Sequence, residues 1–284
     1  MKSGDIIGKI LFLCASFSAV LVFLITFFLL QQGAEAINLG FLTGMIWMPS
    51  RDLYGIIPTL LGTLIVSAGA IIIALIIGIP TAIYLAEFAP FWLRNILKST
   101  IEVIVGIPSI VIGFFGIMVI IPFLRANFGG GDGSILAGWI VLAFMTLPNI
   151  ITLTEDSLRA VPESLREGSL ALGATKWQTI IKVVIPAALP GILTGVLLGM
   201  GKAIGETAVV WLTAGSGLEA FIPRTIKSPT GSLPMYIYLL ATQGHTSEGM
   251  KNAFGASLIL LTMFLTISIG ALKIRNYYLK RLGK

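Results

Sequence analysis

An all-α fold that crosses a membrane six times is what this sequence predicts, on three observations: composition, long apolar runs and the distribution of positive charge. Hydrophobic residues make up 56% of the 284 positions and charged residues only 11%, with a mean hydropathy of +0.97. A water-soluble domain could not cover that composition with polar surface. Six apolar runs are long enough to cross a hydrocarbon core about 30 Å thick. No alternating barrel pattern is present, so each run is expected to be a helix.

The first apolar run has the flanks of a cleaved signal peptide. Lys2 and Lys9 precede it, and Ala34-Glu35-Ala36 follows it. Its uninterrupted apolar length, however, exceeds the about 7–15 residues of a signal peptide's hydrophobic region. We therefore expect a retained span. The six expected spans are Ile10–Leu30, Ile57–Leu85, Val103–Leu124, Ile135–Leu153, Val183–Leu212 and Phe254–Leu272.

The distribution of lysine and arginine predicts the orientation of the spans. If the N-terminus lies inside, thirteen of the 19 basic residues fall in inner segments, five fall in outer segments, and Lys202 lies within the fifth span. Basic residues accumulate on the cytoplasmic side of membrane proteins, so both termini are expected in the cytoplasm. The net charge of +6 then reflects this orientation and not a nucleic-acid partner. The five outer residues are Arg51, Arg125, Arg224, Lys227 and Lys251.

Several kinds of site are disfavoured by what the sequence lacks. Cys14 is the only cysteine and His245 the only histidine, so neither a disulfide framework nor a multi-histidine metal site is expected. The pattern GxxxxGK[ST] does not occur, so the chain cannot hydrolyse ATP by that route. The glycine run at 129–133 is expected to be a plain loop, because no Lys-Ser/Thr pair follows it. We therefore expect no enzyme activity and no bound metal or cofactor.

The inner connection between the fourth and fifth spans is amphipathic and charged. It runs from Glu155 to Pro186, and its pattern predicts two short interfacial helices joined at Gly173 in a left-handed conformation. One interpretation is a segment lying on the lipid headgroups. Mixed acidic and basic residues argue against that interpretation. Four apolar side chains offer anchors for a protein groove instead, namely Leu165, Leu170, Leu172 and Trp177.

The third span contains residues that permit bending and close helix contact. They are Gly106, Pro108, Gly113 and Gly116. Proline removes one backbone hydrogen bond, and glycine removes the side chain. Small residues are common at helix contacts in membranes, so pure packing and a role in lining a pathway both stay open.

Two charges, Lys202 and Glu206, lie within the expected fifth span. A charge at the bilayer centre costs at least about 2.5–3.5 kcal/mol, so neither is expected to face lipid unpaired. Four residues apart on one helix, the two side chains can form an ion pair that holds helices together. Alternatively, Lys202 attracts a translocating oxyanion, and Glu206 balances that charge or accepts a hydrogen bond from a phosphate hydroxyl. Thr207, Thr194 and Ser109 could supply hydroxyl groups.

The residues Glu167-Gly168-Ser169-Leu170-Ala171-Leu172-Gly173, followed after nine positions by Val183-Val184-Ile185-Pro186, resemble the EAA loop of ABC importer permeases. Gly168 and Ser169 replace the two alanines of that motif. The resemblance implies that Glu167, Ala171, Leu172 and Gly173 belong to a cytoplasmic coupling helix. In that family the helix docks into a groove of the ATP-binding subunit.

Other stretches are similar to the phosphate-specific permeases within that family. They are Tyr84-Leu85-Ala86-Glu87-Phe88, Gly106 to Gly116, Arg159 to Pro190, and Ala203-Ile204-Gly205-Glu206-Thr207. Leu189 to Gly195 and Ser232-Leu233-Pro234 resemble the PstA type more than the PstC type. One position departs from the family: Lys202 stands where arginine is usual.

The resemblance implies a single permease domain over 1–284, with an N-terminal span and external loop at 1–56 and a core at 57–275. The expected function is import of inorganic phosphate across the cell inner membrane, with sulfate or molybdate as the alternative substrate. The implied partners are a paralogous PstC-type permease, two copies of an ATP-binding subunit that uses ATP, and an external phosphate-binding protein. A self-contained ion channel remains the alternative from another class. An intramembrane hydrolase is poorly supported, because Ser109 has no obvious base beside it.

Overall fold

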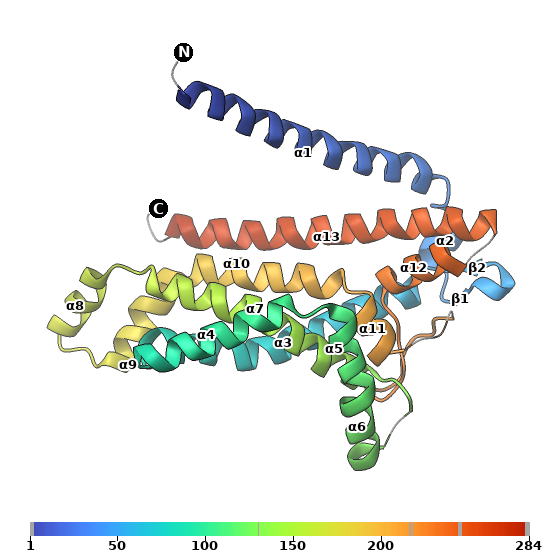
Figure 1. Cartoon of the computed structure of the whole chain (residues 1–284). Helices are drawn as coiled ribbons and strands as arrows, with labels where there is room; N and C mark the ends of the chain where they lie inside the picture. The colour runs from blue at the N-terminus through green and yellow to red at the C-terminus, as the bar shows by residue number, and fades with distance from the viewer. Residues whose placement is uncertain (1–2, 130, 216, 218, 244–245, 282–284) are drawn as a thin grey trace.

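The computed structural model describes residues 3–129, 131–215, 217, 219–243 and 246–281, and His245 lies outside these ranges. Over this part the chain is a bundle of long helices with one short strand pair (Figure 1). Six helical stretches are long and apolar enough to cross a membrane, which confirms the all-α, six-span prediction. They are Ile7–Ala34, Ile57–Glu87, Ser109–Phe128, Ile135–Arg159, Lys176–Ile204 and Ser247–Leu279.

The bounds of the individual elements show where the long stretches are interrupted. The α-helices are α1 (Ser3–Ala34), α2 (Leu39–Thr43), α3 (Ile57–Glu87), α4 (Phe91–Gly106), α5 (Ser109–Phe115), α6 (Ile121–Phe128), α7 (Ile135–Arg159), α8 (Glu163–Ala171), α9 (Lys176–Thr179), α10 (Ile185–Ile204), α11 (Ala208–Thr213), α12 (Leu233–Gln243) and α13 (Ser247–Arg281). The other elements are β1 (Trp47–Met48), the 3-10 turn η1 (Pro49–Arg51), β2 (Leu53–Tyr54) and the π-helical segments η2 (Gly116–Ile120) and η3 (Ile180–Val184).

Helices α3, α7 and α10 form the centre of the bundle, because small residues let their backbones approach. The ring of Trp139 on α7 fills the space beside Gly69 on α3, where a Cβ atom would overlap the ring. The indole Nε1 donates a hydrogen bond of 2.8 Å to the carbonyl of Ile65. Dispersion contacts stabilise this arrangement, since lipid provides no hydrophobic driving force between helices.

The third span differs from the prediction at its beginning. We expected one helix from Val103 to Leu124, but α4 ends at Gly106 and the span starts at Ser109. Ile107 and Pro108 between them are extended, with ψ values of 126° and 136°. A proline disfavours the helical conformation of the residue before it, so the pair ends a helix where we expected only a bend.

The fifth span begins earlier and ends earlier than predicted. We expected Val183 to Leu212, but the span runs from Lys176 through α9, η3 and α10 to Ile204. Gly205, Glu206 and Thr207 form a break before α11 begins. The carboxylate of Glu206 accepts a hydrogen bond of 3.3 Å from the backbone nitrogen of Val209, which caps the start of α11. The break therefore carries the glutamate that we had placed inside a continuous helix.

The two ends of the bundle differ. At one end, called here the α8 end, lie α8 and α9. The C-terminal end of α13 is directed toward the same side of the molecule (Figure 1). At the other, the α12 end, α2, the strand pair and α12 gather around the buried side chain of Trp47. The first helix, α1, stands apart from the bundle and meets α13 only near its own last turn. We had expected an external loop in the segment that forms α2 and the strands.

Candidate functional site

Helix α8 is fastened to the bundle through Arg166. Its Nη1 lies 2.6 Å from Oε1 of Glu87 at the end of α3, and its Nη2 donates a 2.8 Å hydrogen bond to the carbonyl of Leu158 on α7. Its Nε also lies 3.3 Å from Oε2 of Glu163. The Arg166 and Glu87 side chains are 14% and 7% exposed, so water screens their attraction weakly. The arginine therefore holds α8 against two spanning helices at once.

The far end of α8 is closed by backbone geometry that requires glycine. Gly173 has a φ of +84°, in the left-handed region that side chains with a Cβ rarely adopt. Its nitrogen donates to the carbonyl of Leu170, and that of Ala174 donates to the carbonyl of Ser169, at 2.9 and 3.3 Å. This is the Schellman arrangement of a helix C-terminus. The predicted junction at Gly173 is confirmed.

We had predicted a separate interfacial helix after Gly173. That prediction is wrong, because the helix is the first turn of the fifth span. Thr175 and Gln178 form a capping box at the start of α9, which continues through η3 into the fifth span. The hydroxyls of Ser169 and Thr179 lie 2.9 Å apart and join α8 to this first turn. The segment from the start of α8 to the end of α9, residues 163–179, is called here the α8 hairpin, and this hydrogen bond ties its two helices together.

The outward surface of α8, of the turn that follows it and of α9 is apolar at four positions. Leu172 is 91% exposed, and the other three side chains are about half exposed: Leu165 at 47%, Leu170 at 48% and Trp177 at 56%. The residues that we placed in the coupling helix by resemblance, Glu167, Ala171, Leu172 and Gly173, all lie exposed. A leucine this exposed, on a segment this firmly held, is suited to a protein partner.

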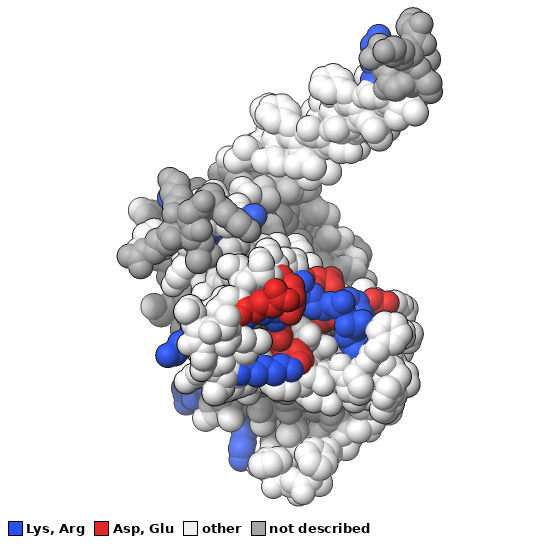
Figure 2. Space-filling model, turned by 90° about the vertical axis from the view of Figure 1, so that its left-hand side faces the viewer, with Lys and Arg blue, Asp and Glu red and all other residues white. Residues whose placement is uncertain are grey.

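Charged side chains gather behind this apolar surface. A cavity of about 420 Å³ separates α8 from the ends of α3 and α4, and Figure 2 shows acidic and basic side chains around a hollow at this end. The basic residues outnumber the acidic ones in its lining. They are Arg94, Arg159, Arg166 and Lys176 against Glu87 and Glu163.

A second group of ion pairs joins α4 to α7. Lys98 Nζ lies 2.8 Å from both Glu155 Oε2 and Asp156 Oδ1, and Arg159 lies 3.6 Å from Glu155 Oε1. The Glu155 side chain is only 2% exposed. Burial acts to lower the pKa of Lys98, but its hydrogen bonds to Asp156 and Glu155 outweigh burial and raise that pKa. Lys98 is therefore a firmly protonated link between the two helices.

Lys202 and Glu206 do not form the ion pair that was one of the two interpretations of their spacing. The helix ends at Ile204, so the two residues do not share a helix face, and within the described residues Lys202 has no carboxylate within 4.0 Å. Instead, the Glu206 carboxylate caps α11, and its backbone carbonyl accepts a 3.1 Å hydrogen bond from Ser232 Oγ. Lys202 is half-buried, and no carboxylate among the described residues pairs with it.

The hydroxyl residues expected near these charges are spread over three elements. Ser109 begins α5, Thr207 lies in the break before α11, and Thr194 lies on α10, where its hydroxyl donates to Pro190. Helix α5 packs against α11, which brings the element of Ser109 next to the element that Thr207 precedes. The structure does not bring Thr194 into this group.

Among the glycines of the third span, two lie at helix contacts. A Cβ atom on Gly113 would come within 2.6 Å of Leu212, and one on Gly116 would overlap Thr213. The backbone of this span therefore runs directly against α11. Gly106, in contrast, faces open space, with no atom within 4 Å of such a Cβ. The expected close approach at Gly106 is absent.

The fold defines a polytopic, α-helical integral membrane protein. The chain belongs to the family described as binding-protein-dependent transport system inner membrane component, which it matches over residues 78–282. It is therefore a permease component of an ABC transporter, which confirms the resemblance to that family.

Three relatives illustrate the match. The chain is 39% identical over 251 residues to the probable ABC transporter permease protein YqgH of Bacillus subtilis, covering 84% of this chain and 80% of that protein. It is 32% identical over 276 residues to the phosphate transport system permease protein PstC of Mesorhizobium japonicum, covering 88% and 81%. It is 34% identical over 228 residues to the phosphate transport system permease protein PstA 1 of Mycobacterium tuberculosis, covering 80% and 73%. Relatives of both Pst types therefore match, and the PstA assignment stays a prediction.

Two solved structures share the fold. A chain of the MetNI methionine ABC transporter, in an inward facing conformation, superposes with a TM-score of 0.64 at 21% identity, covering 78% of this chain and 95% of that one. A chain of a bacterial alginate ABC transporter superposes with a TM-score of 0.63 at 15% identity, covering 99% and 98%. At these identities the likeness concerns the fold alone.

Proposed function

We propose that this chain is one transmembrane subunit of an ATP-driven importer of inorganic phosphate, and that the exposed face of α8 docks onto an ATP-binding subunit. The observation that carries the docking proposal is the exposed Leu172 on a hairpin that is tied to α3, α7 and the fifth span. A rigid attachment is what transmission of a movement requires, because a loose loop would absorb it. The chain lacks a P-loop, so the partner supplies ATP hydrolysis.

We further propose that the α8 end faces the cytoplasm and that the protein lies in the inner membrane. The excess of lysine and arginine in the segments on this side of the spans supports that orientation. Both termini are then cytoplasmic. The α12 end faces outward, where an external phosphate-binding protein would deliver its ligand.

For the substrate path we propose the break at Gly205–Thr207 and the helix that packs against it. Lys202 supports this because a half-buried cation without a carboxylate partner needs another anion to offset its desolvation. Glu206, Thr207 and Ser109 are the proposed neighbours of that anion. A paralogous permease would complete the path, and two copies of the ATP-binding subunit would complete the complex. The names of the Pst relatives favour phosphate over sulfate or molybdate.

One experiment tests the docking and substrate proposals together. The chain is expressed with a terminal tag beside its neighbouring transport genes, purified in mild detergent and analysed by mass spectrometry. We expect an ATP-binding subunit and a second permease to copurify, and membrane vesicles holding this complex to take up labelled phosphate when ATP is present. Copurification without an ATP-binding subunit would contradict the docking proposal. Uptake of sulfate but not phosphate would contradict the substrate.

A further inference from the structure

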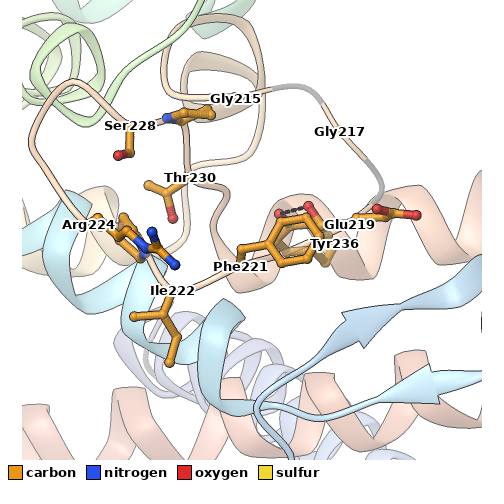
Figure 3. Close-up of a pocket in the computed structure, with 11 residues that line it drawn as sticks. Gly215, Gly217, Glu219, Phe221, Ile222, Arg224, Ser228, Thr230 and Tyr236 are labelled. Carbon is orange, nitrogen blue, oxygen red and sulfur yellow. Dashed lines mark hydrogen bonds between the residues drawn. The ribbon is translucent and has the colours of Figure 1, made fainter.

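A cavity at the α12 end is lined by an exposed arginine that makes no ion pair with any residue the structure describes. Its volume is about 710 Å³, and residues of the segment between α11 and α12 line most of it (Figure 3). Arg224 lies in this lining, and within the described residues it makes no ion pair. An unpaired guanidinium at the wall of a cavity offers up to five donors in a planar fork. The cavity therefore has one strongly positive end.

Beside Arg224 lies a buried hydroxyl group, that of Thr230. This residue is 7% exposed, and its Oγ1 makes no hydrogen bond to the residues that the structure describes. Figure 3 shows this hydroxyl turned toward the guanidinium of Arg224. On another side, Gly62 of α3 lies so close that a Cβ there would come within 2.8 Å of Oγ1. Buried hydroxyls are nearly always hydrogen-bonded, so the partner missing here is expected to come from the cavity.

The acidic residue in the same cavity does not neutralise Arg224. Figure 3 shows the carboxylate of Glu219 at the opposite end of the group and directed away from the guanidinium. Ser50 donates a 3.2 Å hydrogen bond to Oε1 of this carboxylate. Tyr236 lies between Glu219 and Arg224 (Figure 3), and its hydroxyl donates a hydrogen bond to the carbonyl of Glu219. Burial raises the pKa of this phenol, so the tyrosine adds no charge to the cavity. Arg224, Ser228 and Thr230 form the other end, which we call the outer basic end.

The outer basic end is connected to the break at Glu206 by a short stretch of backbone. Thr230 donates from its nitrogen to the carbonyl of Ala214 just after α11, at 3.0 Å, and Ser232 donates from Oγ to the carbonyl of Glu206 just before α11, at 3.1 Å. Helix α11 has six residues, a length of about 9 Å. The cavity therefore lies at one end of α11 and the proposed substrate path at the other.

We propose that the outer basic end is a binding site for a small tetrahedral oxyanion, which occupies it before reaching the break at Glu206. Arg224 binds two oxygen atoms with its fork, and the hydroxyls of Thr230 and Ser228 donate to the others. The identity of the anion as hydrogen phosphate, and its inward direction, rest on the proposed function. The site itself rests on the unpaired arginine and the unpartnered threonine.

Direct binding of inorganic phosphate tests this site. The assembled complex is purified without nucleotide and without the external binding protein, and labelled phosphate binding is measured in a Lys202→Gln background, which removes the inner cation. We expect Arg224→Gln to raise the phosphate Kd about tenfold or more, since hydrogen bonds to charged groups are strong. Thr230→Val, which keeps the shape but removes the hydroxyl, should raise it severalfold. Arg224→Lys should retain part of the affinity.

The matched control is Lys227→Gln. This exposed cation belongs to the same segment, but it donates a 2.5 Å hydrogen bond to the carbonyl of Phe128 and lies outside the cavity lining. Its loss changes the net charge as much as Arg224→Gln does. A phosphate Kd within twofold of the parent is expected. An equal effect of both substitutions would overturn the site in favour of a general field of positive charge.

Four further outcomes bear on the proposal. An unchanged phosphate Kd in Arg224→Gln overturns it. A phospholipid retained by the parent and lost from Arg224→Gln in native mass spectrometry, with the phosphate Kd unchanged, assigns the arginine to a lipid headgroup and also overturns it. If Arg224→Gln weakens attachment of the external binding protein but leaves the phosphate Kd unchanged, the surface is a docking contact for that protein, and the proposal is overturned. If the complex binds and transports sulfate but not phosphate, and Arg224→Gln weakens sulfate binding, the proposed substrate fails while this site stands.

Discussion

Lys98 of α4 and Glu155 of α7 meet at 2.8 Å, although 57 positions separate them in the sequence. The carboxylate is almost fully buried and the ammonium group is partly exposed. Helix α4 leads directly into the extended pair at Ile107–Pro108 and then into α5. This ion pair therefore fixes the helix that links the α8 end to the third span.

Removing the cation should destabilise the protein more than removing both charges. In Lys98→Met, Glu155 stays buried with only Arg159 nearby, and loss of one partner of a buried pair is costly. Because Lys98 is partly exposed, we expect Lys98→Met to lower the free energy of unfolding by about 1–2 kcal/mol, which is less than the cost of breaking a fully buried pair. Lys98→Met with Glu155→Gln should recover at least half of that loss. Thermal unfolding of the purified complex measures both. Asp156→Asn is the control, since that side chain is 54% exposed. If it lowers the stability as much as Lys98→Met does, the effect does not come from the buried carboxylate of Glu155.

The exposed leucine on the α8 hairpin should matter for assembly and not for folding. Leu172→Ser removes a side chain that is 91% exposed, so the stability of the isolated chain should change by less than about 0.5 kcal/mol. If the leucine is buried against an ATP-binding subunit, the substitution should weaken attachment about tenfold. Titration of the purified subunit gives this affinity. Leu39→Ser at the α12 end, where the leucine is 80% exposed, should leave it unchanged.

The left-handed turn after α8 should not tolerate a β-branched residue. Gly173→Val forces a Cβ into a φ of +84°, which costs about 1–2 kcal/mol or more. We expect normal insertion in the membrane but loss of most ATP-driven uptake, because the apolar face of the hairpin is displaced. Gly168→Ala provides the comparison, since Gly168 is helical and faces open space. That variant should keep full uptake. Full uptake by Gly173→Val would count against a docking role for α8.

The unpaired lysine on α10 should be replaceable only by arginine. Lys202→Arg keeps the charge and adds a fork suited to oxyanions, so near-normal phosphate uptake is expected. Lys202→Gln should reduce uptake at least tenfold at equal membrane abundance. The exchange Lys202→Glu with Glu206→Lys should also fail, because it places a carboxylate in the path and removes the cap of α11. Wild-type uptake by Lys202→Gln would remove this residue from the substrate path.

Features set by residues close together in the sequence could be predicted, whereas contacts between residues far apart in the sequence could not. The six spans follow from composition, since each apolar run has one stable conformation in lipid. The turn at Gly173 follows from local chemistry. The breaks at Pro108 and Gly205 had visible signals, but long apolar runs on either side of them outweighed those signals in the prediction. In α4, Arg94, Lys98 and Glu102 recur every four residues, a pattern of one charged helix face that we did not use.

The candidate site was less predictable for a different reason. The partners of Arg166 and Lys98 on other helices, Glu87 and Glu155, lie 79 and 57 positions away, and no local pattern joins them. At Lys202 and Glu206 the opposite happened: the four-residue spacing allowed a pair that the end of the helix at Ile204 prevents. The four-residue spacing has meaning only where the helix continues through both residues.

The isolated position of α1 has a consequence for the order in which the protein is made. Its last turn contacts α13, where Gly33 lies against Phe254 and the rings of Phe28 and Phe254 meet edge to face at 5.6 Å. During synthesis α13 emerges long after α1 has entered the bilayer. Until then α1 must persist as a lone helix, which the uncharged apolar stretch from Ile10 to Leu30 allows. The contact that holds α1 in the finished protein thus forms among the last, and an interrupted chain would leave the first helix free in the membrane.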